Sequence, residues 1–201
     1  MMGERPQLHT SPNIPVFHHS NIPAVLVGGG EIVERNILWA PWRIPYIRGL
    51  EKGEDCFLCH DLAHPEEDTQ NLVLWRTERS IVVLNRFPYN NGHLLVAPAR
   101  HVADLSATSE EEMLELLKLV REAQRALSRA IHPHGFNVGL NFGRCAGAGL
   151  PGHMHLHVVP RWDGDTNFMS VCSDTKVVSQ SLDDLLAELK KASAEHGLPA
   201  L

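Results

Sequence analysis

The sequence predicts an α+β domain in which an antiparallel sheet packs against helices. Two strand-like runs separated by a turn-rich loop come first, and a long amphipathic helix follows them. A second pair of strand-like runs then leads to a final helix, and no internal repeat is visible. With 201 residues, of which 43% are hydrophobic and 21% charged, the chain is long enough to bury one substantial core.

The first pair of strands is predicted at residues 80–84 and 93–97, because both runs are rich in β-branched or aliphatic residues. Residues 85–92 lie between them and contain proline, asparagine and glycine, which favour turns. We therefore expect a hairpin with a long loop. Before it, we expect a short turn at Cys56–Cys59 and an acidic loop that extends to Asp68.

A helix is predicted at residues 110–131, where apolar residues recur at intervals of three and four. Ser109 and Glu112 have the spacing of a capping box at its start. Two further strands, at 136–142 and 153–160, are joined by a glycine-rich loop. The last helix begins near Ser181 and carries a leucine stripe at Leu182, Leu185, Leu186 and Leu189.

The first 36 residues differ in composition from the rest of the chain. They contain four prolines and three consecutive glycines and show no sustained periodicity, so we expect a poorly ordered extension over 1–36. The domain is then expected to cover residues 37–201. Residues 38–43 place two tryptophans around a proline, which favours an extended segment that packs on an apolar surface.

Charge and composition exclude several classes of protein. A formal net charge of −6 argues against a surface that follows a nucleic-acid backbone. The longest apolar runs are far too short to span a bilayer, and no signal peptide is evident, so neither nucleic acid nor membrane is expected as a partner. Four cysteines do not form a disulfide framework at this length, which favours a cytoplasmic protein. The 13 histidines are the unusual feature, because histidine often binds metals or transfers protons.

Three of these histidines alternate with apolar residues in the segment 153–159. On a strand, successive side chains point to opposite faces, so His153, His155 and His157 would share one face while the intervening residues enter the core. A solvated face would rarely consist of imidazoles alone. A metal site formed by all three is a stronger alternative, although three residues in line on one strand rarely converge on one ion.

The pattern His153-Met154-His155-Leu156-His157-Val158-Val159 resembles the motif of the histidine triad (HIT) superfamily. The resemblance extends over roughly residues 37–170 and includes the hairpin segment from Asn85 to His93. Residues 38–43, 136–141 and 158–162 are similar to the bacterial diadenosine tetraphosphate phosphorylase branch of that superfamily. A HIT-like fold is therefore expected.

The resemblance implies transfer of a nucleotidyl group to a histidine. The middle histidine of the motif, His155, would be the nucleophile and would form a covalent adenylyl-histidine. His157 and His93 would bind the phosphates and neutralise developing charge. The substrate would be a nucleotide or a dinucleoside polyphosphate, and the protein would form a homodimer or a higher homo-oligomer.

Three further residues are expected to bind the substrate. Asn85 would hold a ribose hydroxyl, and Asn141 matches a substrate-contacting asparagine of the family with a slight offset in spacing. The loop 143–152 contains four glycines, whose backbone N–H groups could approach phosphate oxygens closely. Gly149 stands in this loop where hydrolases of the family usually have glutamine, which leaves room for phosphorolysis with inorganic phosphate as co-substrate.

Two other functions are compatible with the same residues. The chain could be a dinucleoside polyphosphate hydrolase or a nucleoside phosphoramidase that uses the same covalent step with water. It could also be a zinc-stabilised nucleotide-binding or interaction protein without turnover.

Cys56 and Cys59 are spaced as half of a tetrahedral zinc site. They could instead be free thiols, or a redox pair, which usually lies beside a βαβ unit. Zinc-bearing relatives such as galactose-1-phosphate uridylyltransferase complete their site with histidines that correspond to His101 and His153. That resemblance implies a structural zinc held by four protein ligands, with His60 and His64 as local alternatives.

Overall fold

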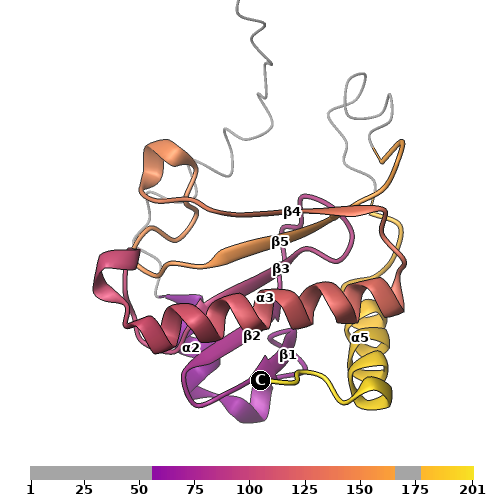
Figure 1. Cartoon of the computed structure of the whole chain (residues 1–201), viewed down its shortest axis with the longest axis horizontal. Helices are drawn as coiled ribbons and strands as arrows, with labels where there is room; N and C mark the ends of the chain where they lie inside the picture. The colour runs from indigo at the N-terminus through magenta and orange to yellow at the C-terminus, as the bar shows by residue number, and fades with distance from the viewer. Residues whose placement is uncertain (1–55, 166–177) are drawn as a thin grey trace, which may run out of the picture. The chain divides into compact units, whose positions relative to one another are not determined.

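The computed structural model describes residues 56–165 and 178–201. The expected extension 1–36 and the tryptophan segment 38–43 lie outside the described residues. The described part of the chain contains a five-stranded sheet in which every neighbouring pair is antiparallel, with helices on both faces (Figure 1). The predicted α+β fold with an antiparallel sheet is therefore confirmed.

The strand order in the sheet is β1-β2-β3-β5-β4. The hairpin β2–β3 forms where it was predicted, and β5 adds to the free edge of β3. This arrangement brings two segments that are distant in the sequence side by side at the centre of the sheet. The bounds are β1 Val73–Arg76, β2 Ser80–Leu84, β3 Leu94–Pro98, β4 Gly135–Leu140 and β5 Leu156–Arg161.

The helices with four or more residues in the described part of the chain are α2 (Phe57–Ala63), α3 (Glu110–Ala130) and α5 (Leu182–His196). The capping box of α3 is present as predicted: the Ser109 hydroxyl accepts from the Glu112 amide, and the Glu112 carboxylate accepts from the Ser109 amide. Ser181 caps α5 in the expected position. None of the helices in this part of the chain has the length and apolar character that a membrane span requires.

The structure corrects three local expectations. The expected turn at Cys56–Cys59 is the start of α2, with Cys56 as the N-cap. Leu58 is fully buried, and this tertiary packing stabilises a helix too short to be recognised from periodicity. Strand β1 was not predicted, because its four residues show no alternation of apolar and polar types. Strand β5 begins at Leu156, so His153 and His155 precede it.

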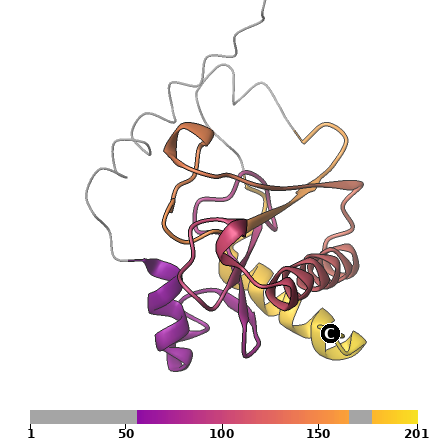
Figure 2. The same ribbon diagram turned by 60° about the vertical axis from the view of Figure 1, so that its left-hand side comes forward.

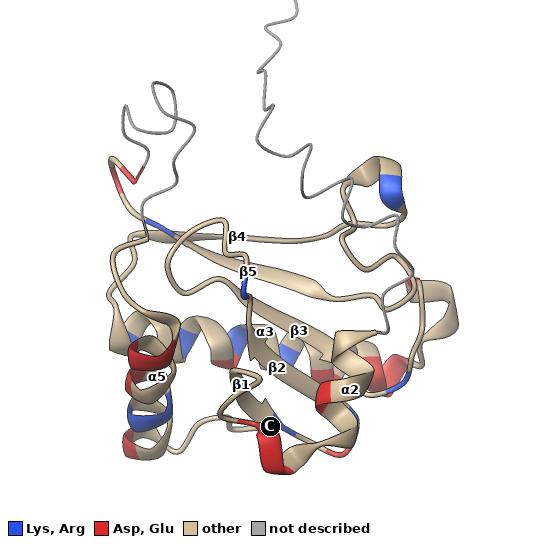
Figure 3. Cartoon of the chain, turned by 180° about the vertical axis from the view of Figure 1, so that it is seen from behind, with Lys and Arg blue, Asp and Glu red and all other residues tan. Residues whose placement is uncertain are grey.

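Each face of the sheet has its own apolar core. Helices α3 and α5 cover one face, and α2 lies on the other (Figures 1 and 2). The larger core contains Met154, Leu156 and Val158 together with residues of α3 and α5. The smaller core joins Leu58 of α2 to Ile81, Val83, Leu95 and Ala97. Charged residues lie on the helices, on the loops and at the last positions of β1 and β5, whereas β2 and β3 carry none (Figure 3).

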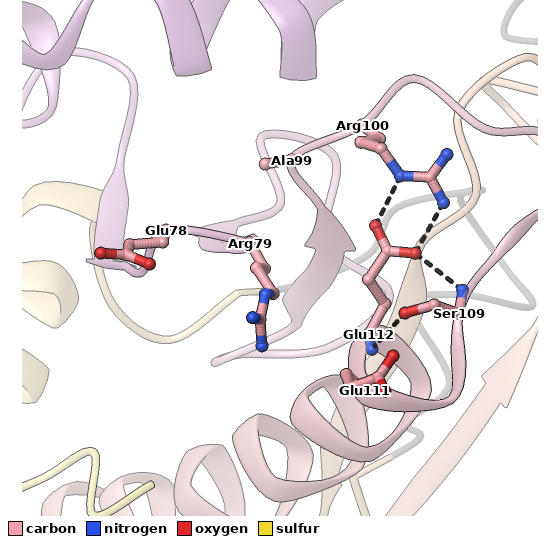
Figure 4. Close-up of a pocket in the computed structure, with 7 residues that line it drawn as sticks. All are labelled: Glu78, Arg79, Ala99, Arg100, Ser109, Glu111 and Glu112. Atoms are coloured by element: carbon pink, nitrogen blue, oxygen red, sulfur yellow. Dashed lines mark hydrogen bonds and ion pairs between the residues drawn. The ribbon is translucent and has the colours of Figure 1, made fainter.

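A network of charged groups ties the end of β3 to the start of α3 (Figure 4). Arg100 donates to the buried Glu112 carboxylate through Nε at 2.7 Å and Nη2 at 2.6 Å. These hydrogen bonds lower the pKa of Glu112 to about 2. An open pocket of about 540 Å³ lies beside this network and contains none of the predicted site residues. Arg100 directly precedes His101, so the network restrains the segment that leads from β3 to α3.

Gly92 lets the β2–β3 loop pack closely against the end of α3. Its φ is +76°, and a Cβ at this position would lie 2.7 Å from Ile131 Cδ1 and 2.9 Å from Leu127 Cδ2. Gly164 has a similar φ of +75° but no neighbouring atom within 4 Å of a Cβ. Substitutions at the two positions therefore distinguish the effect of backbone strain at positive φ from the effect of steric overlap.

We predict that Gly92→Ala destabilises the fold by about 1–3 kcal/mol more than Gly164→Ala does, because only the first substitution overpacks the core. Denaturant unfolding of both variants and the parent protein measures this difference. Equal losses of stability would show that strain at positive φ, rather than packing against α3, explains the glycine at position 92.

Candidate active site and metal centre

The predicted catalytic residues gather on the sheet face opposite α3, where β3 and β5 pair. Leu95 and His157 are direct partners in that pairing. Side chains alternate along both segments, so His157 shares the face of Leu95 while its neighbours Leu156 and Val158 enter the core under α3. The predicted separation of an imidazole face from an apolar face is therefore present at His157, whereas His153 and His155 precede the strand.

Within residues 56–165 and 178–201, the hydrogen bond of the His155 ring engages Nδ1, and none engages Nε2. Its Nδ1 lies 2.9 Å from the backbone carbonyl oxygen of His153. Since a carbonyl only accepts, Nδ1 carries the proton and Nε2 keeps its lone pair. His155 is 7% exposed, and burial lowers its pKa below the ordinary value. A neutral, oriented imidazole of this kind has the properties of a nucleophile at neutral pH.

His157 lies beside His155, with ring centroids 4.9 Å apart. Its Nδ1 is 2.9 Å from His93 Nε2, and its Nε2 is 3.4 Å from Asn141 Nδ2. Burial, and next the neighbouring His155, lower the pKa of His157 to about 4. Asn141 follows the end of β4, so the structure brings together four of the predicted residues from β3, β4, β5 and their flanking segments.

His93 lies too deep for the direct phosphate contact that the sequence predicted. It is fully buried, and both of its ring nitrogens are engaged. Nδ1 accepts from the Tyr89 amide at 3.1 Å and lies 3.3 Å from Asn85 Nδ2, while Nε2 contacts His157. His93 therefore contacts Asn85, Tyr89 and His157 through its ring nitrogens and offers no exposed donor to a substrate.

Tyr89 was not selected from the sequence, although it belongs to this cluster. Its ring stacks on His93 at a centroid distance of 4.7 Å and on His157 at 5.7 Å. The available signal was weak, because an aromatic residue inside a turn-rich loop has no characteristic spacing from the histidines. Asn85 remains partly exposed at the end of β2, where its Oδ1 accepts from the Phe87 amide at 2.9 Å.

The glycine-rich loop leads directly into the histidine segment. Gly143 and Gly147 have φ values of +74° and +89° and flank the short 3₁₀ turn Arg144–Ala146. Gly149 lies four residues before His153 and is partly exposed. Loops of this kind leave backbone N–H groups accessible to anions.

A second cluster lies next to the first and consists of the four predicted metal ligands. The ligand atoms of Cys56, Cys59, His101 and His153 all lie within 4.8 Å of one another. Cys56 Sγ and His153 Nδ1 are 3.2 Å apart, as are Cys59 Sγ and His101 Nδ1. Ligand atoms around a tetrahedral zinc are about 3.6 Å apart, so the donor set and its spacing fit such an ion.

Neighbouring groups orient the two histidines of this cluster. His153 Nε2 donates to the Pro98 carbonyl at 2.8 Å, which leaves the Nδ1 lone pair directed at the cysteines. A Cβ on Gly152 would lie 3.2 Å from His101 Nε2, so glycine at this position leaves space for the ring. The alternatives His60 and His64 stack on each other with ring centroids 4.3 Å apart and are not part of the cluster.

Comparisons with known proteins identify the family of this chain. Residues 66–164 match the sequence model of the HIT domain family. An AP-4-A phosphorylase from Mycobacterium tuberculosis is 39% identical over 163 residues, which are 78% of this chain and 84% of that protein. An asymmetrical bis(5'-nucleosyl)-tetraphosphatase from Schizosaccharomyces pombe is 33% identical over 93 residues, covering 46% of this chain and 50% of that protein.

A solved structure shares the fold. The crystal structure of a Zn-bound histidine triad family protein from Mycobacterium smegmatis aligns with a TM-score of 0.56 and 26% identity, covering 69% of this chain and 95% of that one. The family match, the identity to the phosphorylase and the shared fold agree with one another. The chain belongs to the HIT domain family.

Proposed function

We propose that this HIT-family enzyme transfers an adenylyl group from a diadenosine polyphosphate, most directly diadenosine tetraphosphate, to inorganic phosphate. The observation that carries the proposal is the orientation of His155, whose Nδ1–H donates to the His153 carbonyl and whose Nε2 accepts no hydrogen bond from the described residues. The 39% identity to an AP-4-A phosphorylase over most of the chain supports the same substrate and reaction.

The reaction consists of two displacements at one phosphorus atom. His155 Nε2 attacks the α-phosphorus of an adenylyl group, a P–N bond forms, and the P–O bond to the remaining polyphosphate breaks. With diadenosine tetraphosphate the leaving group is ATP. Inorganic phosphate then attacks the same phosphorus, the P–N bond breaks, and ADP leaves while His155 returns to its neutral form.

The remaining polar residues have supporting roles in this proposal. His157 would donate to an oxygen of the transferring phosphoryl group, where negative charge develops. Asn141, beside His157, would contact the same group. Asn85 retains one amide proton and one oxygen lone pair beyond its internal contacts, which suit a ribose hydroxyl. Backbone amides near Gly149 would hold phosphate oxygens.

The second candidate is hydrolysis of a dinucleoside polyphosphate, in which water replaces phosphate in the second displacement. The identity to a bis(5'-nucleosyl)-tetraphosphatase favours it, but that match covers less than half of this chain. Gly149 supports phosphorolysis instead, because glycine supplies no side-chain amide to position a water molecule. We therefore place hydrolysis second.

We also propose that Cys56, Cys59, His101 and His153 hold one structural zinc ion. When bound, zinc would crosslink the start of α2, the segment after β3 and the segment before β5, and four protein ligands would leave no site for water. His153 belongs to both this cluster and the histidine motif. The metal would therefore restrict the position of the backbone carbonyl that orients His155. A reduced cysteine pair of this kind supports a cytoplasmic location.

We further propose a homodimer formed along the outer edge of β4. This strand ends the sheet and carries neither proline nor lysine, which commonly block edge pairing. Val138 on β4 is 44% exposed, and Leu117 on α3 is 61% exposed. Both side chains lie on the sheet side that α3 covers, because Val158, the partner of Val138, belongs to that core.

Diadenosine tetraphosphate should yield ATP and ADP with phosphate present, and turnover should nearly stop when phosphate is omitted. His155→Ala should lower kcat more than about 10³-fold, because the nucleophile is lost. The exposed His134→Ala serves as the matched control and should retain parent activity. Chromatographic product analysis measures both effects, and AMP formed at an equal rate without phosphate would favour the hydrolase.

The metal proposal predicts about one zinc per chain by elemental analysis. Cys56→Ser should lower both zinc content and thermal stability, since the binding energy of a structural metal is also folding energy. Cys145→Ser, at an exposed cysteine outside the cluster, should change neither quantity. Unchanged zinc content in Cys56→Ser would contradict the proposed ligand set.

The dimer proposal predicts that light scattering finds twice the chain mass for the parent protein. Val138→Lys should shift the mass to that of one chain, because it places a charge on the pairing edge. Leu201→Lys, at an exposed apolar residue outside β4, is the matched control and should remain dimeric. A Val138→Lys protein that stays dimeric would place the interface elsewhere.

A further inference from the structure

The hydrogen bonds around His93 determine which of its ring nitrogens carries a proton. A backbone amide can only donate, so the contact from Tyr89 N at 3.1 Å requires a lone pair on His93 Nδ1. The Asn85 amide reinforces this requirement. Its Oδ1 accepts from the Phe87 amide at 2.9 Å, which turns its Nδ2 donor toward His93 Nδ1 at 3.3 Å. Two donors therefore converge on the same nitrogen.

The tautomer of His93 in turn determines which ring nitrogen of His157 carries a proton. With Nδ1 unprotonated, neutral His93 carries its proton on Nε2, which lies 2.9 Å from His157 Nδ1. His157 Nδ1 must then accept, and its own proton is on Nε2. His157 Nε2 lies 3.4 Å from the side-chain amide of Asn141, on the side where the substrate is proposed to bind. An N–H at Nε2 requires this amide to turn its Oδ1, rather than its Nδ2 donor, toward the ring.

Burial keeps both imidazoles in the neutral form that this assignment needs. Desolvation is the main cause that lowers the pKa of His93 to about 3 and that of His157 to about 4, and the nearby His155 adds to both effects. The Tyr89 ring stacks on both imidazoles and contributes to this burial. A charged His93 would also direct a second N–H at the Tyr89 and Asn85 donors.

We propose that Tyr89, through its backbone amide, and His93, through its ring, are positioning residues that fix His157 as an Nε2–H donor toward the substrate. The adjacent His155 has the opposite assignment, with its proton on Nδ1 and its lone pair on Nε2. The site therefore presents one nucleophilic nitrogen and one hydrogen-bond donor from two neighbouring imidazoles. The reversed form of His157 would direct a lone pair at phosphate oxygens.

The catalytic consequence rests on the proposed function, but the proton assignment can be measured without any substrate. Long-range ¹H–¹⁵N correlation spectra of the uniformly ¹⁵N-labelled full chain report the tautomer of each histidine ring. We expect Nε2–H forms of His93 and His157 at pH 7. Couplings across the hydrogen bonds should connect Tyr89 N with His93 Nδ1, and His93 Nε2 with His157 Nδ1.

An Nδ1–H form of either ring, or a charged ring at pH 7, would overturn the proposal. The spectra do not depend on turnover, so they are informative even if phosphorolysis is not detected. Failure of the proposed reaction would then be distinguished from failure of the tautomer assignment.

Two variants of His93 test the consequence for catalysis. His93→Leu removes the donor to His157 Nδ1, so His157 should become a mixture of tautomers and kcat should fall about 10²-fold with little change in KM. The amide of His93→Gln can still donate to that nitrogen and should recover most of the loss and the Nε2–H form. Thermal unfolding controls for folding. Equal kcat values in two folded variants would show that His93 only fills space.

Discussion

The antiparallel register between β3 and β5 is the constraint on which the site depends. Side chains alternate along both strands, so one register places Leu94 and Val158 in the core under α3 and Leu95 and His157 on the opposite face. A slip by one residue would exchange these faces. The burial of the apolar residues therefore orients the histidines, and the energy that stabilises the fold also aligns the reactive groups.

Much of the fold and the identity of most site residues could be predicted from the sequence. Strand β2, the capping box of α3 and the alternation around His155 depend on local patterns, which single sequences display well. Strand β1 and helix α2 could not be predicted, because each is short and owes its stability to contacts such as the burial of Leu58 against the sheet. The complete burial of His93 could not be predicted either, since its spacing from Asn85 indicates proximity to the site but not the exposure of its side chain.

Backbone carbonyl and amide groups determine the orientation of several histidine rings in the site. The His153 carbonyl orients His155, the Pro98 carbonyl orients His153, and the Tyr89 amide orients His93. No residue type encodes such a contact, which explains why Tyr89 was missed. The cluster of four metal ligands includes His153, which lies two residues before His155. The proposed metal site and the proposed nucleophile therefore share one short segment.

Trapping the covalent intermediate would show whether His155 itself receives the adenylyl group. The protein would be mixed with diadenosine tetraphosphate without phosphate, quenched under alkaline conditions that preserve a P–N bond, and digested for mass spectrometry. We expect one adenylyl group on the peptide that contains residues 153–157, with fragmentation placing it on His155. An adenylyl group on His157, or turnover without any labelled histidine, would contradict this expectation.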